Sequence, residues 1–382
     1  MKIVFLTLHL RQGGAENHMA NLIKYWPNSG DKLWVVSLWG EGELNSKLQS
    51  QVKIYTLESA TIPGPLLRFF AVPRLVRKLQ KVLATLNPDI VVTFLWFPTW
   101  IVSEISPPQT HLVWSVQNDL VDEYQGGSGY LKRWFTRKSV QNVDHFVAIS
   151  PGIRDQLTQA YGVAPHKIRI IPNSISLQEV VNGADEAADI PARAYPLRFV
   201  FSGRLHPQKG WDLLLQAVKM VEDDVLAEFW VLGRGPEEKK FIKTVQALGV
   251  EKRVFFAGFQ RNPSAWYASA DALISTSRWE PFGLVIAEAM ALGRPVVATP
   301  THGARFIIQH LQNGYLFRDF TPGSIAEGIR WIWKVKNTPK WEEMMSNARQ
   351  SAQRFDAGRV ARMYRIYLQE LLKSQGNGDA HG

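Results

Sequence analysis

Residues 280–288 read Glu280-Pro-Phe-Gly-Leu-Val-Ile-Ala-Glu288, and this stretch decides how the chain is interpreted. Pro281 disfavours helical backbone at the preceding residue, so we expect Glu280 on a loop and a helix that begins near Gly283. A glycine there lets a ligand approach the backbone closely. The unpaired backbone amides of Leu284 and Val285, together with the helix dipole, favour an anion above the helix start.

The two glutamates of this stretch add hydrogen-bond acceptors to the anion cradle. Glu288 lies about one helical turn beyond the start, where its carboxylate can accept hydrogen bonds from paired hydroxyls. Glu280 offers a second acceptor, and the combination suits a sugar nucleotide. The alternative is an ordinary amphipathic helix, because acidic residues are common in a first helical turn.

A second candidate site is the loop Ser202-Gly-Arg-Leu-His-Pro-Gln-Lys-Gly210. It follows a strand-like run at 197–201 and precedes an amphipathic run at 211–221, which predicts a strand–loop–helix junction. Arg204 and Lys209 can clamp a diphosphate from such a loop, the arginine as a planar fork and the lysine as a point charge. The alternative is a solvated loop with ordinary surface charges.

Together with four further motifs, these stretches resemble, in the same order, the retaining glycosyltransferases of family 4. The further motifs are Gly13-Gly-Ala-Glu16, Ser150-Pro-Gly-Ile153, Ile171-Pro-Asn-Ser174 and Asn313-Gly-Tyr-Leu316. The resemblance covers nearly the whole chain. It implies the GT-B fold, an α/β architecture in which two Rossmann-like α/β/α domains face each other across a cleft.

Strand-like and helix-like runs alternate along the chain, which predicts parallel sheets covered by helices. A stretch poor in large apolar residues, 180–196, is interpreted as a linker. We expect an N-terminal Rossmann-like domain over 1–180 and a C-terminal one over 197–355. The resemblance implies that the first domain holds the acceptor, that the second holds the nucleotide sugar, and that a helix over 356–373 crosses back. The expected strands lie at 3–8, 32–38, 90–94, 112–115, 146–149, 168–171, 199–201, 228–232, 254–256, 272–275 and 295–298.

The same resemblance gives roles to the site residues. Arg204 and Lys209 are expected to stabilise the charge on the diphosphate as the glycosidic bond breaks. Glu280 is expected to hold hydroxyls of the transferred sugar, and Glu288 to accept from the ribose hydroxyls. The other donor-binding positions are Gly13, Gly14, Gly203, Gly258, Phe259, Phe282, Gly283, Leu284 and Val285. For the first two glycines, a purely structural role in a tight turn is an equally good interpretation.

The sequence departs from the family at the sugar and acceptor positions. Many members carry a histidine where this chain has Gln117-Asn118, which can hydrogen-bond a sugar but cannot act as an acid or base. Glu16 is a candidate acceptor contact, although an ordinary helix-start acid explains it more simply. The resemblance implies attack on the same face of the sugar, with the departing phosphate taking the acceptor proton.

The chain has 382 residues, 46% of them hydrophobic, and contains no cysteine. The length fits two globular domains, and the absence of cysteine excludes disulfides, thiolate catalysis and cysteine metal sites. No Asp-x-Asp pair suggests a metal-held diphosphate, so we expect neither metal nor cofactor. The N-terminal apolar run is too short for a secretory signal and no run reaches membrane-spanning length, so we expect a cytoplasmic protein.

The net charge of +10 implies an acidic partner. Cations alternate with aromatic residues and leucines in two segments, 66–81 and 130–138, and such segments can lie on an anionic membrane surface. This would place the protein peripherally on the inner face of the cell membrane. The alternative is an amphipathic helix that packs on its own sheet and exposes its basic face to solvent. The cations of the first segment are Arg68, Arg74, Arg77, Lys78 and Lys81. No nucleic-acid-binding signature is present, so nucleic acid is not expected.

The resemblance implies a retaining, hexosyltransferase-type glycosyltransferase. It would move a sugar from a nucleotide-diphosphate sugar, with UDP as the expected nucleotide, to a glycan or lipid-linked acceptor in bacterial polysaccharide, lipopolysaccharide or glycolipid synthesis. The alternatives are a GT-B nucleotide-sugar epimerase, which uses water and no acceptor, and a non-catalytic sugar-nucleotide-binding protein. A Rossmann dehydrogenase is disfavoured, because Gly233-Arg-Gly235-Pro lacks the third glycine of the dinucleotide motif and no such motif follows the first strand.

Overall fold

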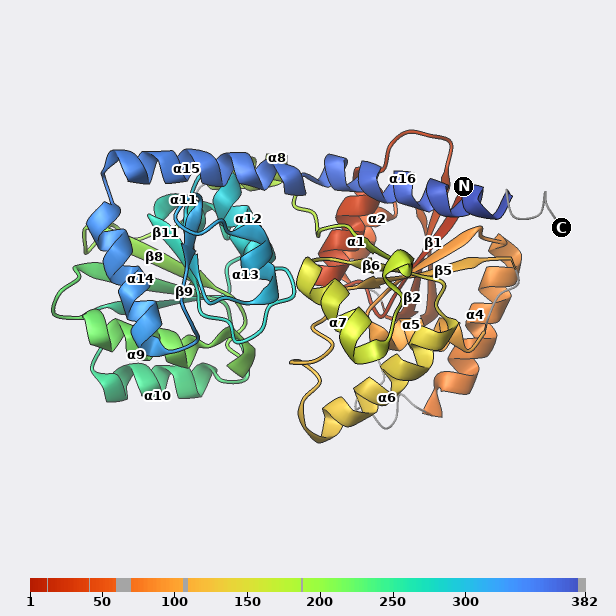
Figure 1. Cartoon of the computed structure of the whole chain (residues 1–382), viewed down its shortest axis with the longest axis horizontal. Helices are drawn as coiled ribbons and strands as arrows, with labels where there is room; N and C mark the ends of the chain where they lie inside the picture. Colours follow the sequence, from red (N-terminus) through yellow and green to blue (C-terminus); the bar gives the residue numbers. More distant parts are fainter. Residues whose placement is uncertain (12, 41, 60–69, 106–108, 187, 377–382) are drawn as a thin grey trace. The chain divides into compact units, whose positions relative to one another are not determined.

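The computed structural model describes residues 1–376 apart from 12, 41, 60–69, 106–108 and 187. The chain divides into two compact units, Met1–Ser174 with Ala357–Gly382, and Ile175–Asp356 (Figure 1). Each unit is built on a parallel β-sheet. No helix in the described part of the chain is both long enough and apolar enough to cross a bilayer.

The first unit has a sheet of order β3-β2-β1-β4-β5-β6-β7. Its strands are β1 (Lys2–Thr7), β2 (Lys32–Trp39), β3 (Lys53–Glu58), β4 (Ile90–Phe94), β5 (His111–Val116), β6 (His145–Ala148) and β7 (Ile168–Ile170). Its helices are α1 (Gly14–Lys24), α2 (Glu43–Leu48), α4 (Val72–Leu86), α5 (Trp96–Ser103), α6 (Gly126–Asn142), α7 (Pro151–Tyr161) and α16 (Ala357–Gly376), with a 3₁₀ turn at Pro165–Lys167.

Helices cover both faces of this sheet, so its central strands are buried on both sides and consist of nearly continuous apolar residues. Figure 1 shows α1, α2 and α16 on one face and α4, α5 and α6 on the other. The last helix belongs to the first unit because Val360, Tyr364 and Leu368 are buried in its core. The Tyr364 hydroxyl also lies 2.7 Å from Ser115 Oγ at the end of β5.

The second unit has a sheet of order β10-β9-β8-β11-β12-β13. Its strands are β8 (Leu197–Ser202), β9 (Ala227–Leu232), β10 (Val254–Gly258), β11 (Ala272–Ser275), β12 (Val296–Ala298) and β13 (Gly314–Leu316). Its helices are α8 (Leu177–Asp185), α9 (Trp211–Val221), α10 (Glu238–Leu248), α11 (Ser264–Ser269), α12 (Leu284–Ala291), α13 (His302–Ile307), α14 (Pro322–Val335) and α15 (Pro339–Ala352), with 3₁₀ turns at Pro207–Lys209 and Gln353–Phe355.

The stretch expected as a linker from residue 180 onward is helical up to Asp185. Ser176 caps α8 by accepting a hydrogen bond from the Glu179 amide, and α8 packs against α11 and α12. A capped helix with an apolar side, including buried Val180, is stable there because the second unit covers it. The boundary between the units therefore falls between Ser174 and Ile175.

Candidate functional site

In the second unit, the two motif loops leave the sheet side by side. β8 pairs in parallel with β11, and the chain continues from β8 toward β9 but from β11 toward β12. The connections therefore run in opposite directions, which makes this a topological switch point, where open α/β sheets bind ligands. The Arg204–Lys209 loop follows β8, and the Glu280 loop follows β11.

Lys209 and Glu280, predicted separately from two motifs, form an ion pair between Nζ and Oε2. Their side chains keep only 19% and 13% of their surface exposed. The backbone beneath them is fixed, because Thr276 Oγ1 donates to the carbonyl oxygens of Lys209 and Gly210 at 3.2 and 2.9 Å. Gly210 has φ +61°, and a Cβ there would lie 2.0 Å from the Thr276 carbonyl oxygen. The glycine is thus required by both conformation and space.

Arg204 is exposed on the same loop, and it makes no hydrogen bond or ion pair with the residues that the structure describes. Gly203 precedes it, and a Cβ on Gly203 would sit 3.3 Å from the aliphatic carbons of the Lys209 side chain. The glycine therefore leaves room for the lysine to reach Glu280. The loop presents one cation that is already paired and one that is available to an anion.

The expected helix start is present, since α12 begins at Leu284 with Gly283 as its N-cap at φ +94°. No described residue accepts a hydrogen bond from the amide of Leu284 or Val285. Glu280 is held on the preceding loop, where its carbonyl oxygen accepts from the Gly303 amide at 2.8 Å. This helix end thus offers unpaired donors and a partial positive charge next to the Lys209–Glu280 pair.

Glu288 lies partly buried one turn inside α12, and burial raises the pKa of its carboxyl group to about 7. It neighbours Tyr267, whose hydroxyl donates to Ser202 Oγ at 2.8 Å at the end of β8. Burial, and next the charge of Glu288, raise the pKa of Tyr267 well above its usual value. Glu288 therefore lies at the same edge of the sheet as the β8 loop.

The other predicted donor positions of this unit differ in what they expose. Gly258 ends β10 with φ +68°, and Phe259 beside it keeps 64% of its surface exposed. Phe282, in contrast, is 1% exposed and packs edge-on against Phe355 at 5.2 Å between ring centroids. Its side chain belongs to the local core, so only its backbone is available to a ligand.

Sequence reasoning missed Arg234 as a candidate site residue. It follows β9, its carbonyl oxygen accepts from the Leu205 amide at 3.0 Å, and its Nε lies 3.7 Å from where a Cβ on Gly258 would be. The exposed guanidinium makes no hydrogen bond or ion pair with the described residues. The available signal was an arginine between Gly233 and Gly235 directly after a strand, which we compared only with a dinucleotide motif.

In the first unit, Gly13 and Glu16 form one small cluster with His9 at the end of β1. Glu16 is 4% exposed, burial raises the pKa of its carboxyl group to about 7, and His9 Nδ1 lies 3.4 Å from its Oε1. A Cβ on Gly13 would lie 2.4 Å from Glu16 Oε2 and displace it. Gly13 therefore has a packing function here, and Gly14 is the exposed first residue of α1.

Gln117 and Asn118 follow β5 and are both held by neighbours. Gln117 Nε2 donates to Ser115 Oγ at 2.9 Å, and the same hydroxyl contacts Tyr364 of α16. Its Oε1 is buried without a hydrogen-bond partner among the described atoms. Asn118 Nδ2 donates to Glu123 Oε2 at 2.8 Å. A ligand hydroxyl that donates a hydrogen bond to Gln117 Oε1 would satisfy this acceptor.

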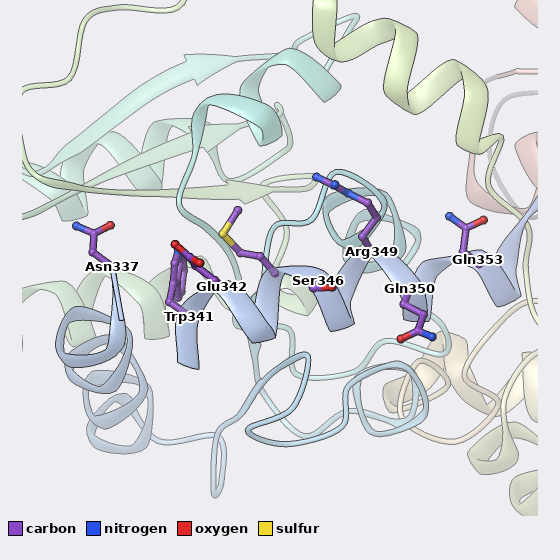
Figure 2. A pocket seen from close by; sticks show the side chains of 8 residues that line it. Asn337, Trp341, Glu342, Ser346, Arg349, Gln350 and Gln353 are labelled. Carbon is purple, nitrogen blue, oxygen red and sulfur yellow. The ribbon is translucent and has the colours of Figure 1, made fainter. Parts of the chain in front are cut away.

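The structure also contains a hollow of about 760 Å³ along α15 (Figure 2). Its lining residues are Asn337, Trp341, Glu342, Met345, Ser346, Arg349, Gln350 and Gln353. None of them is a predicted site residue, and all of them come from α15 and the turns directly before and after it. We therefore assign it no part in the chemistry.

Comparison with known proteins matches each half of the chain to a glycosyltransferase family model. Residues 12–179 match the model "Glycosyltransferase Family 4", and residues 185–351 match "Glycosyl transferases group 1". A Campylobacter jejuni N-acetylgalactosamine-N,N'-diacetylbacillosaminyl-diphospho-undecaprenol 4-alpha-N-acetylgalactosaminyltransferase is 25% identical, covering 96% of this chain and 99% of that protein. The lipopolysaccharide core biosynthesis glycosyltransferase LpsE of Rhizobium meliloti is 31% identical over 55% of this chain and 61% of its own length.

Among solved structures, HepE of Anabaena in complex with UDP superimposes with a TM-score of 0.78. It is 22% identical, with 97% of this chain and all of that chain covered, so it shows the fold alone. The expected fold is confirmed: two parallel-sheet α/β domains of the GT-B type. The chain belongs to the family 4 glycosyltransferases.

Proposed function

We propose that this glycosyltransferase is retaining and metal-independent, and that it transfers a sugar from a UDP-sugar to a glycan or lipid-linked acceptor. The observation that carries the proposal is the arrangement at the switch point of the second unit. There, unpartnered Arg204, the unpaired amides at the start of α12 and the Lys209–Glu280 pair come from neighbouring loops. This set combines donors for a diphosphate with an acceptor for sugar hydroxyls.

In this proposal, the bond between the sugar C1 and the diphosphate oxygen breaks, and its electron pair goes to the diphosphate. Arg204, Lys209 and the amides of Leu284 and Val285 stabilise the negative charge that grows there. The acceptor oxygen bonds to C1 on the same face, and its proton passes to the departing phosphate oxygen. Because cations of the protein supply the positive charge, the reaction needs no divalent metal ion.

The remaining donor contacts follow from position. Glu288 accepts from the ribose hydroxyls, and exposed Phe259 beside Gly258 offers a face on which the base can stack. Arg234 follows β9, whose neighbours in the sheet are β10, which ends at Gly258, and β8, which precedes Arg204. It adds a second available cation. In the first unit, Gly13 and Gly14 allow close approach of substrate, and Glu16, Gln117 and Asn118 are the candidate contacts to the acceptor or sugar.

The acceptor is proposed from the relatives. The name of the C. jejuni relative describes an undecaprenol-diphosphate-linked acceptor, and that of LpsE places it in lipopolysaccharide core synthesis. A lipid-linked acceptor would bring this chain to the cytoplasmic membrane surface as a peripheral protein. Its net charge of +10 favours such a surface.

The test is a thermal-shift screen of UDP- and GDP-sugars, followed by product analysis. A donor that binds the folded state raises the melting temperature, by mass action. The anomeric configuration of the product, measured by NMR, then decides retention. An epimerised free sugar formed without any acceptor would favour the GT-B epimerase alternative instead. Binding without turnover on any lipid-linked or soluble glycan would favour the non-catalytic one.

A further inference from the structure

We propose that the outward face of α6 is a docking surface for an anionic lipid bilayer. The α6 face is defined as Tyr130, Leu131, Arg133, Trp134, Arg137 and Lys138. The proposal rests on the proposed function, in which the acceptor is lipid-linked, and it names the membrane-contacting element. It commits to segment 130–138 and excludes the described part of segment 66–81.

The α6 face exposes large apolar side chains at helical spacing. Tyr130 is 66% exposed, and Leu131 and Trp134 are each 51% exposed, whereas the next residue, Phe135, is only 8% exposed. Tyrosine and tryptophan one turn apart place amphipathic rings on the same side of the helix. Such rings prefer the boundary between lipid headgroups and acyl chains, where one edge is apolar and the other is hydrated.

Cations flank these rings. Arg137 is exposed and Arg133 is half-buried, and neither makes a hydrogen bond or ion pair with the residues that the structure describes, so both charges are available to lipid phosphates. Lys138 Nζ lies 6.0 Å from the centroid of the Trp134 ring and 2.7 Å from Glu104 Oε1. An apolar stripe with cations at its borders is complementary to an anionic bilayer, which offers negative headgroups above an apolar interior.

A row of aromatic rings connects the α6 face with the carboxyl edge of the sheet. Phe135 lies 4.8 Å from Trp134 and 6.0 Å from Trp96, measured between ring centroids. Trp96 in turn contacts Phe97, which stacks on Trp39 at 5.2 Å. Trp39 ends β2 and Trp96 begins α5 just after β4, so the row ends where open α/β sheets bind ligands. Docking through α6 would thus bring lipid-linked acceptors near that edge.

The other basic segment has a structural explanation in its described part. In α4, Leu75 and Leu79 are buried, so the apolar side of that helix faces the core. Arg74 and Lys78 pair with Glu58 Oε1 at 2.8 and 3.0 Å. Arg68 and the rest of 66–69 lie outside the described residues. Apart from these, the described part of the segment exposes two cations, Arg77 and Lys81, and one large apolar side chain, Phe70 (82% exposed), whereas the α6 face exposes three large apolar side chains.

The experiment is co-sedimentation of the full chain with phosphatidylcholine vesicles, with and without phosphatidylglycerol. Arg133→Gln/Arg137→Gln removes two unpaired cations from α6. Arg77→Gln/Lys81→Gln removes two cations at the same spacing from α4 and is the matched control. One cation at an anionic surface changes binding by roughly fivefold, so the α6 variant should bind about 25-fold more weakly, whereas the α4 variant should bind like the parent.

A third variant tests the apolar contribution at unchanged charge. Tyr130→Ser/Trp134→Ser should also weaken pelleting with anionic vesicles, because the rings no longer enter the headgroup boundary. The melting temperature of each variant without ligand reports whether it folds. Equal losses in the α4 and α6 charge variants, unchanged pelleting in both α6 variants, or no pelleting of the parent at low salt would overturn the proposal.

The same samples separate this proposal from the proposed function. The melting-temperature increase caused by UDP-sugar is measured for the parent and every variant, and we expect it to be the same in all of them. A parent that responds to UDP-sugar but does not pellet refutes docking through α6 alone. A parent that pellets through α6 but responds to no sugar nucleotide refutes the donor assignment alone.

Discussion

The Lys209–Glu280 ion pair makes a quantitative prediction, because it joins two residues to which we assign different catalytic functions. Lys209→Ala leaves the Glu280 carboxylate without its partner. The two side chains are 19% and 13% exposed, between a surface pair worth about 0–1 kcal/mol and a buried pair whose disruption costs about 3–5 kcal/mol. We therefore expect a loss of about 2 kcal/mol in the free energy of unfolding of the second unit.

For a unit of this size, about 1 kcal/mol corresponds to roughly 2–4 °C in the melting temperature, so Lys209→Ala should melt roughly 4–8 °C lower. From its loop position alone, replacing Lys209 would be expected to have little effect on stability. Its ion pair with Glu280 changes that expectation. Glu280→Gln removes the negative charge at nearly constant volume. In the double variant, no uncompensated charge remains, so it should be more stable than the sum of the two single losses predicts.

Turnover should respond differently from stability. Each single replacement should lower turnover by roughly 10²-fold, the usual effect of removing one electrostatic stabiliser, and the double variant should regain part of the lost stability but none of the lost turnover. The assay combines differential scanning fluorimetry with release of UDP from the donor that the screen identifies. Lys219→Ala with Glu222→Gln is the control: this pair, 2.7 Å apart at the C-terminal end of α9, keeps 51% and 25% of its side-chain surfaces exposed and should show little coupling.

Two results would refute this reasoning. Additive stability losses would mean that the ion pair does not stabilise the free protein. Parent-like turnover of Lys209→Ala would remove the lysine from the diphosphate clamp, whatever its stability.

Three further predictions concern the same edge of the sheet. Arg204→Ala should lower kcat/KM by roughly 10²-fold without a change in melting temperature, since Arg204 has no partner to lose among the described residues; parent-like kcat/KM would remove it from the site. Activity should survive excess EDTA, and loss that Mn²⁺ or Mg²⁺ reverses would contradict metal independence. The pKa of Glu288, raised to about 7 from an ordinary 4.5, means that its neutral form is favoured in the folded protein. Its contribution to stability is present below about pH 4.5 and is lost as the pH rises through about 7. Glu288→Gln should flatten this decline in thermal unfolding across the pH range, and an unchanged slope would contradict the assignment.

The sequence was sufficient for the individual loops but not for their contacts. Pro281 and Gly283 determine local backbone, so the start of α12 could be predicted within a residue. The contact between Lys209 and Glu280 depends on β8 pairing with β11, with another two strands between them in the chain. Local patterns cannot supply such a neighbour relation, which is set by the packing of the whole unit.

Three elements, β3, β13 and α8, were not predicted from the sequence, each for a reason that lies in its local sequence. β3 reads Lys-Ile-Tyr-Thr-Leu-Glu and lies at the edge of its sheet, where alternating polar residues are tolerated and no continuous apolar run marks the strand. β13, with three residues, is too short for periodicity to detect. α8 was hidden because the sequence beyond it, up to residue 196, is poor in large apolar residues. Its stability comes from packing on α11 and α12.

The ion pair also predicts that Arg204 and Lys209, the two residues of the diphosphate clamp, act at different stages of the reaction. Before the donor binds, Glu280 already neutralises Lys209, whereas Arg204 is unpaired and free to attract the diphosphate. Arg204 should then contribute mainly to binding, and Lys209 mainly when the growing negative charge competes with Glu280 for its ammonium group. An interaction that strengthens only in the transition state raises kcat, while one present equally in the bound substrate lowers KM. We therefore expect the loss in Arg204→Ala to appear mostly as a higher KM and the loss in Lys209→Ala mostly as a lower kcat. Steady-state kinetics with the identified donor measure the split, and the opposite distribution would mean that the pair opens already when the donor binds.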